Sequence, residues 1–205
     1  MLFNLPAGDW AAGDRGTASD PSRVQEFRGE VEDALSYADT LDVEQLNCLA
    51  GLRLDGVEEA VQWSTLVGNV RHAARRLATA GRCLLVEPVN AYDVPGFLLP
   101  TADDALRLID EVAEPNVLLQ FDAYHVRRME GDPAGRLRPL LGRVGHVQVA
   151  DHPGHHQPGT GEIDFAALFE LLDSAGYEGA VGLEHVPPPD TAGSLGWLQE
   201  LTWSA

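Results

Sequence analysis

The chain has 205 residues, 44% of them hydrophobic, and its 32 acidic side chains outnumber the 14 basic ones to give a formal net charge of −18. This charge disfavours nucleic acid and anionic membranes as partners, because both bind clustered positive charge. All the basic residues are arginine, and a chain without lysine cannot form the Schiff base of pyridoxal phosphate enzymes or imine-forming aldolases. The length suits one core, so residues 1–205 are expected to form a single domain.

Short apolar runs alternate along the chain with longer stretches that have helical spacing. The runs predicted as strands are residues 2–5, 43–49, 83–87, 117–122, 145–150 and 180–184. The stretches predicted as helices are residues 21–40, 56–80, 102–112, 133–141, 165–175 and 193–203. The residues expected to cap helices are Asp20 before Pro21, Thr101, and Asp132 before Pro133.

The alternation of strand and helix predicts a parallel sheet with right-handed crossovers. An open nucleotide-binding sheet is disfavoured, because the first strand leads into LPAGDWAAGDRG rather than into a glycine-rich phosphate turn. The other architecture with this alternation is a TIM-type α/β barrel. Such a barrel places functional side chains at the carboxyl ends of several strands.

Two cysteines, Cys48 and Cys83, lie in predicted strands. Buried, reduced thiols are expected there rather than a disulfide or a metal pair. No secretory segment is recognisable, and no apolar run is long enough to cross a bilayer. The cytoplasm is therefore the expected location.

Four successive predicted strands end at or near a side chain with a ligand-type oxygen. Glu87 closes CLLVE, Asp122 closes VLLQFD, Gln148 lies in HVQVAD before Asp151, and Glu184 closes GAVGLE. Their separations of 35, 26 and 36 residues each correspond to about one strand–helix unit, so in a barrel they would surround one mouth. Three carboxylates repel one another unless a cation joins them, and an all-oxygen set favours Mg²⁺ or Mn²⁺ over zinc.

The segments LLVEPVNAYDVPGFLL, LLQFDAYHVRRMEGD, GHVQVADHPG and PGTGEID resemble the hydroxypyruvate isomerase family, a branch of the xylose isomerase-like TIM barrels. The resemblance covers nearly the whole chain. It implies a metal held by Glu87, Asp122, Gln148 and Glu184, with Glu87 and Glu184 as the proton donor and acceptor. It also implies isomerisation of hydroxypyruvate to tartronate semialdehyde through a metal-stabilised enediolate, without a redox or nucleotide cofactor.

The same resemblance implies two substrate contacts, His125 and His155, and Asp93 is a third candidate because its loop carboxylate could contact a substrate hydroxyl. His125 matches a D-x-x-H pattern that begins at Asp122, and Asp93 lies in the loop after the third strand. His155 stands where relatives usually carry arginine, so carboxylate binding is expected to weaken or to become pH dependent. The loop at 150–164 is expected to cover the mouth, with Gly159, Thr160 and Gly161 allowing close approach of a small anionic substrate. Weaker candidates are Asn4, Asn47 and His146.

Six predicted strands are two fewer than a complete barrel has. By the resemblance, residues 2–5 match the third strand, so units 3 to 8 are present and the first two are absent. Either the chain starts at an internal methionine, or it is a genuine shortened form. An incomplete barrel would expose strand edges and apolar surface, so either instability or a homo-oligomeric partner over the gap is expected.

Three other functions compete with hydroxypyruvate isomerisation. The first is isomerisation or epimerisation of a longer 2-oxo acid or a ketose, as in a 2-oxo-tetronate isomerase. The second is a DNA repair hydrolase, which would need zinc-binding histidines and a basic groove, and the net charge of −18 opposes it. The third is a truncated relic without catalysis, which predicts no thermal stabilisation by Mn²⁺.

Overall fold

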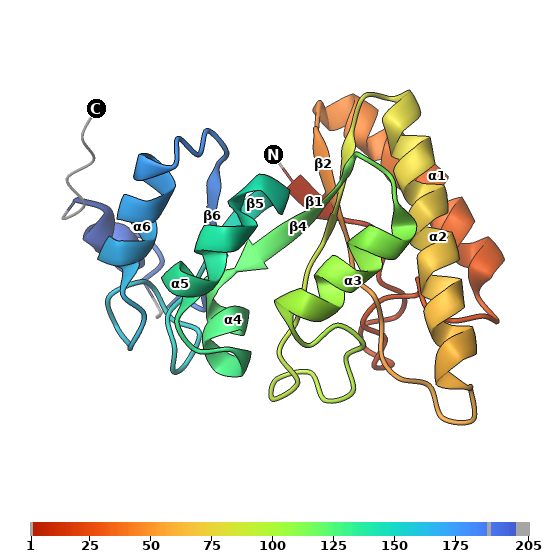
Figure 1. Ribbon diagram of the computed structural model, residues 1–205, viewed down its shortest axis with the longest axis horizontal. Helices are drawn as coiled ribbons and strands as arrows, with labels where there is room; N and C mark the ends of the chain where they lie inside the picture. Colours follow the sequence, from red (N-terminus) through yellow and green to blue (C-terminus); the bar gives the residue numbers. More distant parts are fainter. Residues whose placement is uncertain (1, 188–189, 200–205) are drawn as a thin grey trace. The chain divides into compact units, whose positions relative to one another are not determined.

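The computed structural model describes residues 2–187 and 190–199, and it contains two compact units, Met1–Gln120 and Phe121–Ala205. Within these described residues, six strands form a sheet in the order β1-β2-β3-β4-β5-β6. The pairings β1–β2, β2–β3, β3–β4 and β5–β6 are all parallel, and helices alternate with the strands along the chain (Figure 1). The predicted succession of parallel strands and crossover helices is thus confirmed.

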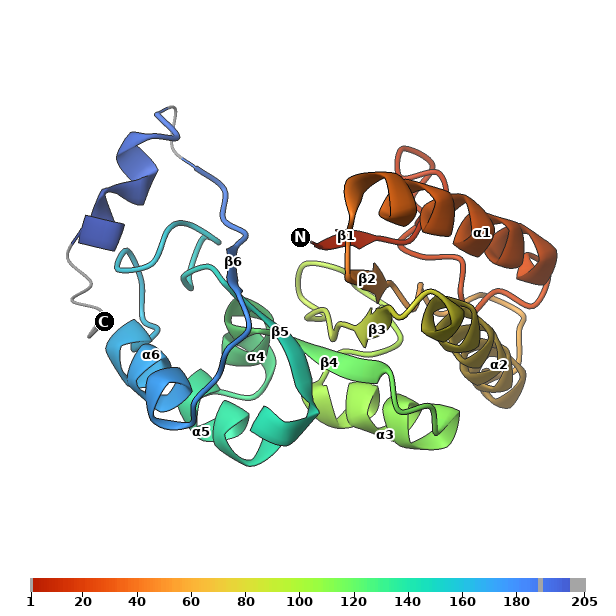
Figure 2. The same ribbon diagram turned by 90° about the horizontal axis from the view of Figure 1, so that it is seen from above.

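The first unit contains β1 (Leu2–Asn4), β2 (Gln45–Cys48), β3 (Cys83–Val86) and the start of β4 (Val117–Asp122). Its helices are α1 (Val24–Leu41), α2 (Glu59–Thr79) and α3 (Ala102–Val112), and they lie along one face of these strands (Figure 2). The core includes the fully buried side chains of Val31, Leu46, Leu66, Leu84, Leu108 and Leu119. This apolar layer fixes the strands whose ends carry polar residues.

The second unit contains the end of β4, together with β5 (Val144–Val149) and β6 (Val181–Leu183). Its helices are α4 (Ala123–Met129), α5 (Pro133–Leu137) and α6 (Phe165–Ser174), with 3₁₀ helices η1 (Arg138–Arg143) and η2 (Gly193–Gln199). Helix α4 packs against β5, and α5 packs against both α4 and α6. The apolar face of α6 is buried through Phe165, Leu168, Phe169 and Leu172.

Register and strand alternation place the polar side chains of the first unit on one face of its strands. Asn4 pairs with Asn47, and Asn47 pairs with Leu85. Glu87 follows Leu85 by two residues, so its side chain points to the same face. The helices cover the opposite face, to which Leu46, Leu84 and Val86 contribute. The face of the strands that points away from the helices therefore carries the candidate site.

Three of these helix predictions are wrong in their bounds, and one of them is the stretch 56–80, where α2 begins only at Glu59. Helix α1 begins at Val24 and not at Pro21, because the Asp20 carboxylate accepts the N–H and the O–H of Ser22 in a separate turn. The stretch 133–141 divides into α5 and η1, since Pro139 has no N–H to continue the α-helical hydrogen bonds. The predicted caps Thr101 and Asp132 are confirmed, each accepting a hydrogen bond from a backbone N–H of its helix.

Helix α4 is not predicted by the sequence pattern. Its seven residues follow β4 without a loop, and the residue that caps it is Asp122, the last residue of the strand. The predicted helix over 193–203 is a 3₁₀ helix over Gly193–Gln199, and residues 200–203 lie outside the described residues.

Both cysteines are free thiols, as expected. Cys48 is buried, and burial raises the pKa of its thiol to about 12, so it is almost wholly protonated at neutral pH. Burial also raises the pKa of Cys83, which is partly exposed. Across residues 2–187 and 190–199, no helix combines the length and the apolar character needed to cross a membrane.

Candidate metal centre and active site

Glu87 lies directly after β3, and its carboxylate is buried with 6% of the residue exposed. The amide nitrogen of Asn47, on the neighbouring strand β2, donates a hydrogen bond of 2.8 Å to Glu87 Oε2. The same nitrogen donates to Asn4 Oδ1 on β1 at 3.0 Å. Three adjacent strands thus contribute to holding one carboxylate. Asn4 and Asn47 rank low by sequence, where the only signal for them is their place at strand ends.

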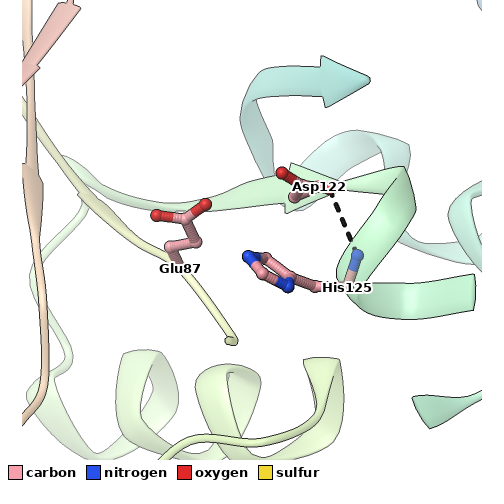
Figure 3. Close-up of side chains that lie close together, drawn as sticks. All are labelled: Glu87, Asp122 and His125. Carbon is pink, nitrogen blue, oxygen red and sulfur yellow. Dashed lines mark hydrogen bonds between the residues drawn. The ribbon is translucent and has the colours of Figure 1, made fainter. Parts of the chain in front are cut away.

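Asp122 is fully buried at the end of β4 and is the N-cap of α4. Its Oδ1 accepts the backbone N–H groups of Tyr124 at 2.7 Å and His125 at 3.2 Å (Figure 3). Its Oδ2 is buried and has no hydrogen-bond partner among the described residues. A buried carboxylate oxygen without a donor is costly, and a cation would satisfy it. This oxygen is the structural feature that fits the predicted divalent metal.

Gln148 and Glu184 lie together in the second unit. Gln148 on β5 is in register with Gly182 on β6, and Glu184 follows Gly182 by two residues on the same face. The Gln148 amide nitrogen donates to Glu184 Oε2 at 2.5 Å. Although the Glu184 side chain is exposed, desolvation raises its pKa, and the negative charge of Asp122 raises it further. His125 and the bond from Gln148 oppose these effects.

Gly182 leaves room for two side chains on that face. A Cβ atom at this position would lie 2.8 Å from His146 Nε2 and 3.3 Å from Gln148 Cγ. His146 is buried, and desolvation lowers its pKa, which favours the neutral imidazole. The neighbouring His185 bonds to Ser194 instead, which agrees with the alternation that turns it away from the site.

The loop after β5 is organised around the carboxylate of Asp151, which is fully buried. Its Oδ1 accepts from His152 N at 2.8 Å and Ile163 N at 3.1 Å, and its Oδ2 accepts from Gly159 N at 2.9 Å and Gly161 N at 2.7 Å. A Cβ atom at Gly161 would lie 2.2 Å from the carbonyl oxygen of His152. The close approach observed at these glycines is therefore to the protein's own Asp151 and His152. The close approach of a substrate to Gly159 and Gly161 stays a prediction.

The three predicted substrate residues occupy different surroundings. His125, in the first turn of α4, and His155, in the loop after β5, both lie near Tyr124, with ring centroids 5.4 Å and 4.2 Å from that of the tyrosine. The two imidazoles are 6.3 Å apart and stacked. Asp93 is exposed in the loop after β3, where its carboxylate accepts a 2.8 Å bond from Asn90. The structure thus brings His125 and His155 together in the second unit and places Asp93 in the first.

Within the second unit, Asp122 and His125 both carry side-chain atoms that could bind an ion (Figure 3). Asp122 belongs to the predicted metal quartet. His125, predicted to contact the substrate, is a possible ligand that sequence reasoning missed, although its place in the first turn of a helix after Asp122 was the available signal. The donor set of carboxylate oxygens and one imidazole suits a divalent cation.

Known proteins are similar to this chain over almost its whole length. The model of the xylose isomerase-like TIM barrel family matches residues 2–201. Hydroxypyruvate isomerase of Escherichia coli is 43% identical over 197 residues, covering 96% of this chain and 76% of its own length. A 2-oxo-tetronate isomerase of Cupriavidus necator is 39% identical, covering 97% and 76%.

Solved structures give the same fold. An AP endonuclease, family 2, from Brucella melitensis is 40% identical, with a TM-score of 0.93 over 98% of this chain and 77% of that one. A 3-keto-D-glucoside 4-epimerase from E. coli is 26% identical, with a TM-score of 0.79 over 92% and 77%. The six strand–helix units are those of a TIM-type fold. The chain belongs to the xylose isomerase-like TIM barrel family and, within it, to the hydroxypyruvate isomerase family of isomerases.

Proposed function

We propose that the chain isomerises hydroxypyruvate to tartronate semialdehyde in a reaction that depends on Mg²⁺ or Mn²⁺. The observation that carries the proposal is the buried, unpartnered Oδ2 of Asp122 at the end of β4, in a chain 43% identical to a hydroxypyruvate isomerase. The metal would be held by Glu87, Asp122, Gln148 and Glu184. When bound, such an ion supplies positive charge that stabilises negative charge on the substrate oxygens.

Glu87 and Glu184 carry the proton transfers in this proposal. One of the two carboxylates removes a proton from the hydroxymethyl carbon. The other carboxylic acid returns a proton to the former carbonyl carbon, and the hydroxyl proton moves from the oxygen of the first carbon to that of the second. The raised pKa of Glu184 supports the role of a base, because a carboxylate with a higher pKa binds a proton more strongly. Asn47 and Gln148 hold the two carboxylates in place by hydrogen bonds.

Metal binding is expected to raise the melting temperature. Mn²⁺ at about 100 times its Kd should stabilise the fold by about 2.7 kcal/mol, which corresponds to about 5–10 °C for a chain of this size. The measurement is a thermal melt of metal-free protein with and without Mn²⁺. The Asp122→Asn variant should lose the shift, and Asp103→Asn, on the first turn of α3, should retain it. A wild-type melt unchanged by Mn²⁺ would favour the non-catalytic relic.

His155 is expected to make substrate binding pH dependent. A positively charged imidazole attracts a carboxylate and a neutral one does not, so KM for hydroxypyruvate should increase from pH 6 to pH 8. The His155→Arg variant carries a permanent charge and a bidentate donor, so its KM at pH 8 should be about tenfold lower than that of wild type and nearly independent of pH. His156→Arg, at an exposed neighbour, is the matched control. A wild-type KM that is flat over this range would contradict the role of His155.

A second candidate substrate is a four-carbon 2-oxo acid, favoured by the 39% identity to a 2-oxo-tetronate isomerase. Steady-state assays and solvent-deuterium exchange on hydroxypyruvate, 2-oxo-tetronate and ketoses separate the two candidates. Activity on the longer substrates without activity on hydroxypyruvate would overturn our first choice. We propose no nucleic-acid or membrane partner, because the net charge of −18 opposes binding to polyanions. We also propose a cytoplasmic location. His125 and Asp93 complete the proposed substrate contacts.

A further inference from the structure

Asn47 is a buried amide whose hydrogen bonds run toward Glu87. It is fully buried, it lies one residue before the end of β2, and it shares a strand face with Glu87. Its Nδ2 donates to Glu87 Oε2 at 2.8 Å and to Asn4 Oδ1 at 3.0 Å. An amide NH₂ group has two hydrogens, and these two bonds use both. The amide is therefore held in one orientation by acceptors on both neighbouring strands.

The oxygen atom of the Asn47 amide is less well hydrogen bonded than its nitrogen. Asn47 Oδ1 is buried and has no hydrogen-bond partner among the described residues. An unpaired buried acceptor destabilises a protein by about 1–3 kcal/mol, so stability alone would favour an apolar side chain of similar size. Buried polar groups kept under such conditions are concentrated at functional sites. The group that benefits here is the Glu87 carboxylate.

We propose that Asn47 is a positioning residue for Glu87, an inference that rests on the proposed function. Its N–H fixes Oε2 and thereby the rotation of the carboxylate group, so that Glu87 presents a constant geometry to metal and substrate. Asn4 acts one step further away, by orienting the Asn47 amide. Partners that orient a metal ligand in this way typically contribute a factor of about 10–100 to metal affinity or activity.

The test uses two substitutions of similar volume that both remove the donor. Asn47→Leu deletes the polar group, and Asn47→Asp keeps the shape but places an acceptor beside Glu87 Oε2. Each variant should bind Mn²⁺ alone about 10–100-fold more weakly by calorimetry, and each should lower kcat for hydroxypyruvate by a similar factor. KM should stay within about twofold of wild type, because both hydrogens of the Asn47 amide are already bonded to Glu87 and Asn4 and none is left to bind substrate. If Asn47→Asp fails to fold, Asn47→Leu carries the test alone.

Asn4 supplies a second test through a double-mutant cycle. Asn4→Ala should weaken Mn²⁺ binding by about two- to fivefold in the wild-type background and should have no further effect in Asn47→Leu. A control for loss of a buried amide is Asn69→Leu on α2. Asn69 is also almost fully buried and donates to the carbonyl of Ala18 at 2.9 Å. This control should lower thermal stability and leave Mn²⁺ affinity and kcat unchanged.

Folded Asn47 variants with wild-type Mn²⁺ affinity and kcat would overturn the inference, as would a loss confined to KM. These outcomes differ from failure of the proposed function. In that case the wild-type protein itself would not isomerise hydroxypyruvate, while its Mn²⁺ affinity would still respond to Asn47 if the inference holds. A wild-type protein that binds no Mn²⁺ would overturn both.

Discussion

Replacing Glu184 with glutamine is expected to lower kcat for hydroxypyruvate by about 10²–10⁴-fold, the range found when a positioned acid–base group is removed. The amide has nearly the same shape but cannot accept and return a proton. Because the Glu184 side chain is exposed, the substitution should leave the melting temperature of metal-free protein within about 2 °C of wild type. The measurement is a steady-state assay, with deuterium incorporation from solvent as an independent readout of proton transfer.

Glu178→Gln is the matched control for this substitution. Glu178 is an exposed glutamate in the same unit, before β6, and its replacement removes the same charge away from the strand end. Its kcat should stay close to that of wild type. If Glu184→Gln retained full activity with normal deuterium incorporation, Glu184 would have no role in proton transfer, and only its proposed part in metal binding would remain to be tested.

Replacing Asp151 with alanine is expected to destabilise the protein by about 3–5 kcal/mol, because buried backbone N–H groups left without an acceptor each cost about 1–3 kcal/mol. The carboxylate accepts four backbone N–H groups, from His152, Gly159, Gly161 and Ile163. Without it these donors lose their acceptor in a loop that has little other regular structure. Urea unfolding followed by circular dichroism measures the change.

Asp164→Ala tests whether any aspartate that accepts a backbone hydrogen bond would have the same effect. Asp164 is the exposed N-cap of α6, and its side chain accepts only from Ala167 N, at 3.0 Å. Its loss should cost about 1 kcal/mol, as for other helix caps. Equal destabilisation by the two substitutions would show that the Asp151 carboxylate has no special place in organising the loop.

The sequence predicts the parts of the fold that depend on local patterns. Alternating apolar runs identify all six strands, and the strand-end positions of Glu87 and Glu184 follow from where each run stops. The cap at Thr101 is predictable because a hydroxyl at that place and an acid three residues later form a local motif. The prediction that Asp20 caps a helix at Pro21 is wrong, because its carboxylate binds the N–H and the O–H of Ser22 instead.

Contacts between distant residues are harder to predict. The bond from Asn47 to Glu87 joins residues 40 positions apart, and it depends on the register of two strands, which neither strand sequence determines alone. Asp122 looks like a metal ligand at a strand end, but its second role as the cap of α4 requires a helix too short to show a periodic pattern. The four bonds to Asp151 require the loop to fold back on its own beginning, which no linear motif specifies.

Gly182 restricts which amino-acid substitutions this protein can tolerate. Every other amino acid would bring a carbon to 2.8 Å from His146 Nε2 and to 3.3 Å from Gln148 Cγ, so the His146 side chain would have to shift. Mutant libraries designed to change the substrate range should therefore keep glycine at position 182 and vary the side chains around it. During evolution, a substitution at position 182 would require the His146 side chain to shift or to be replaced by a smaller one.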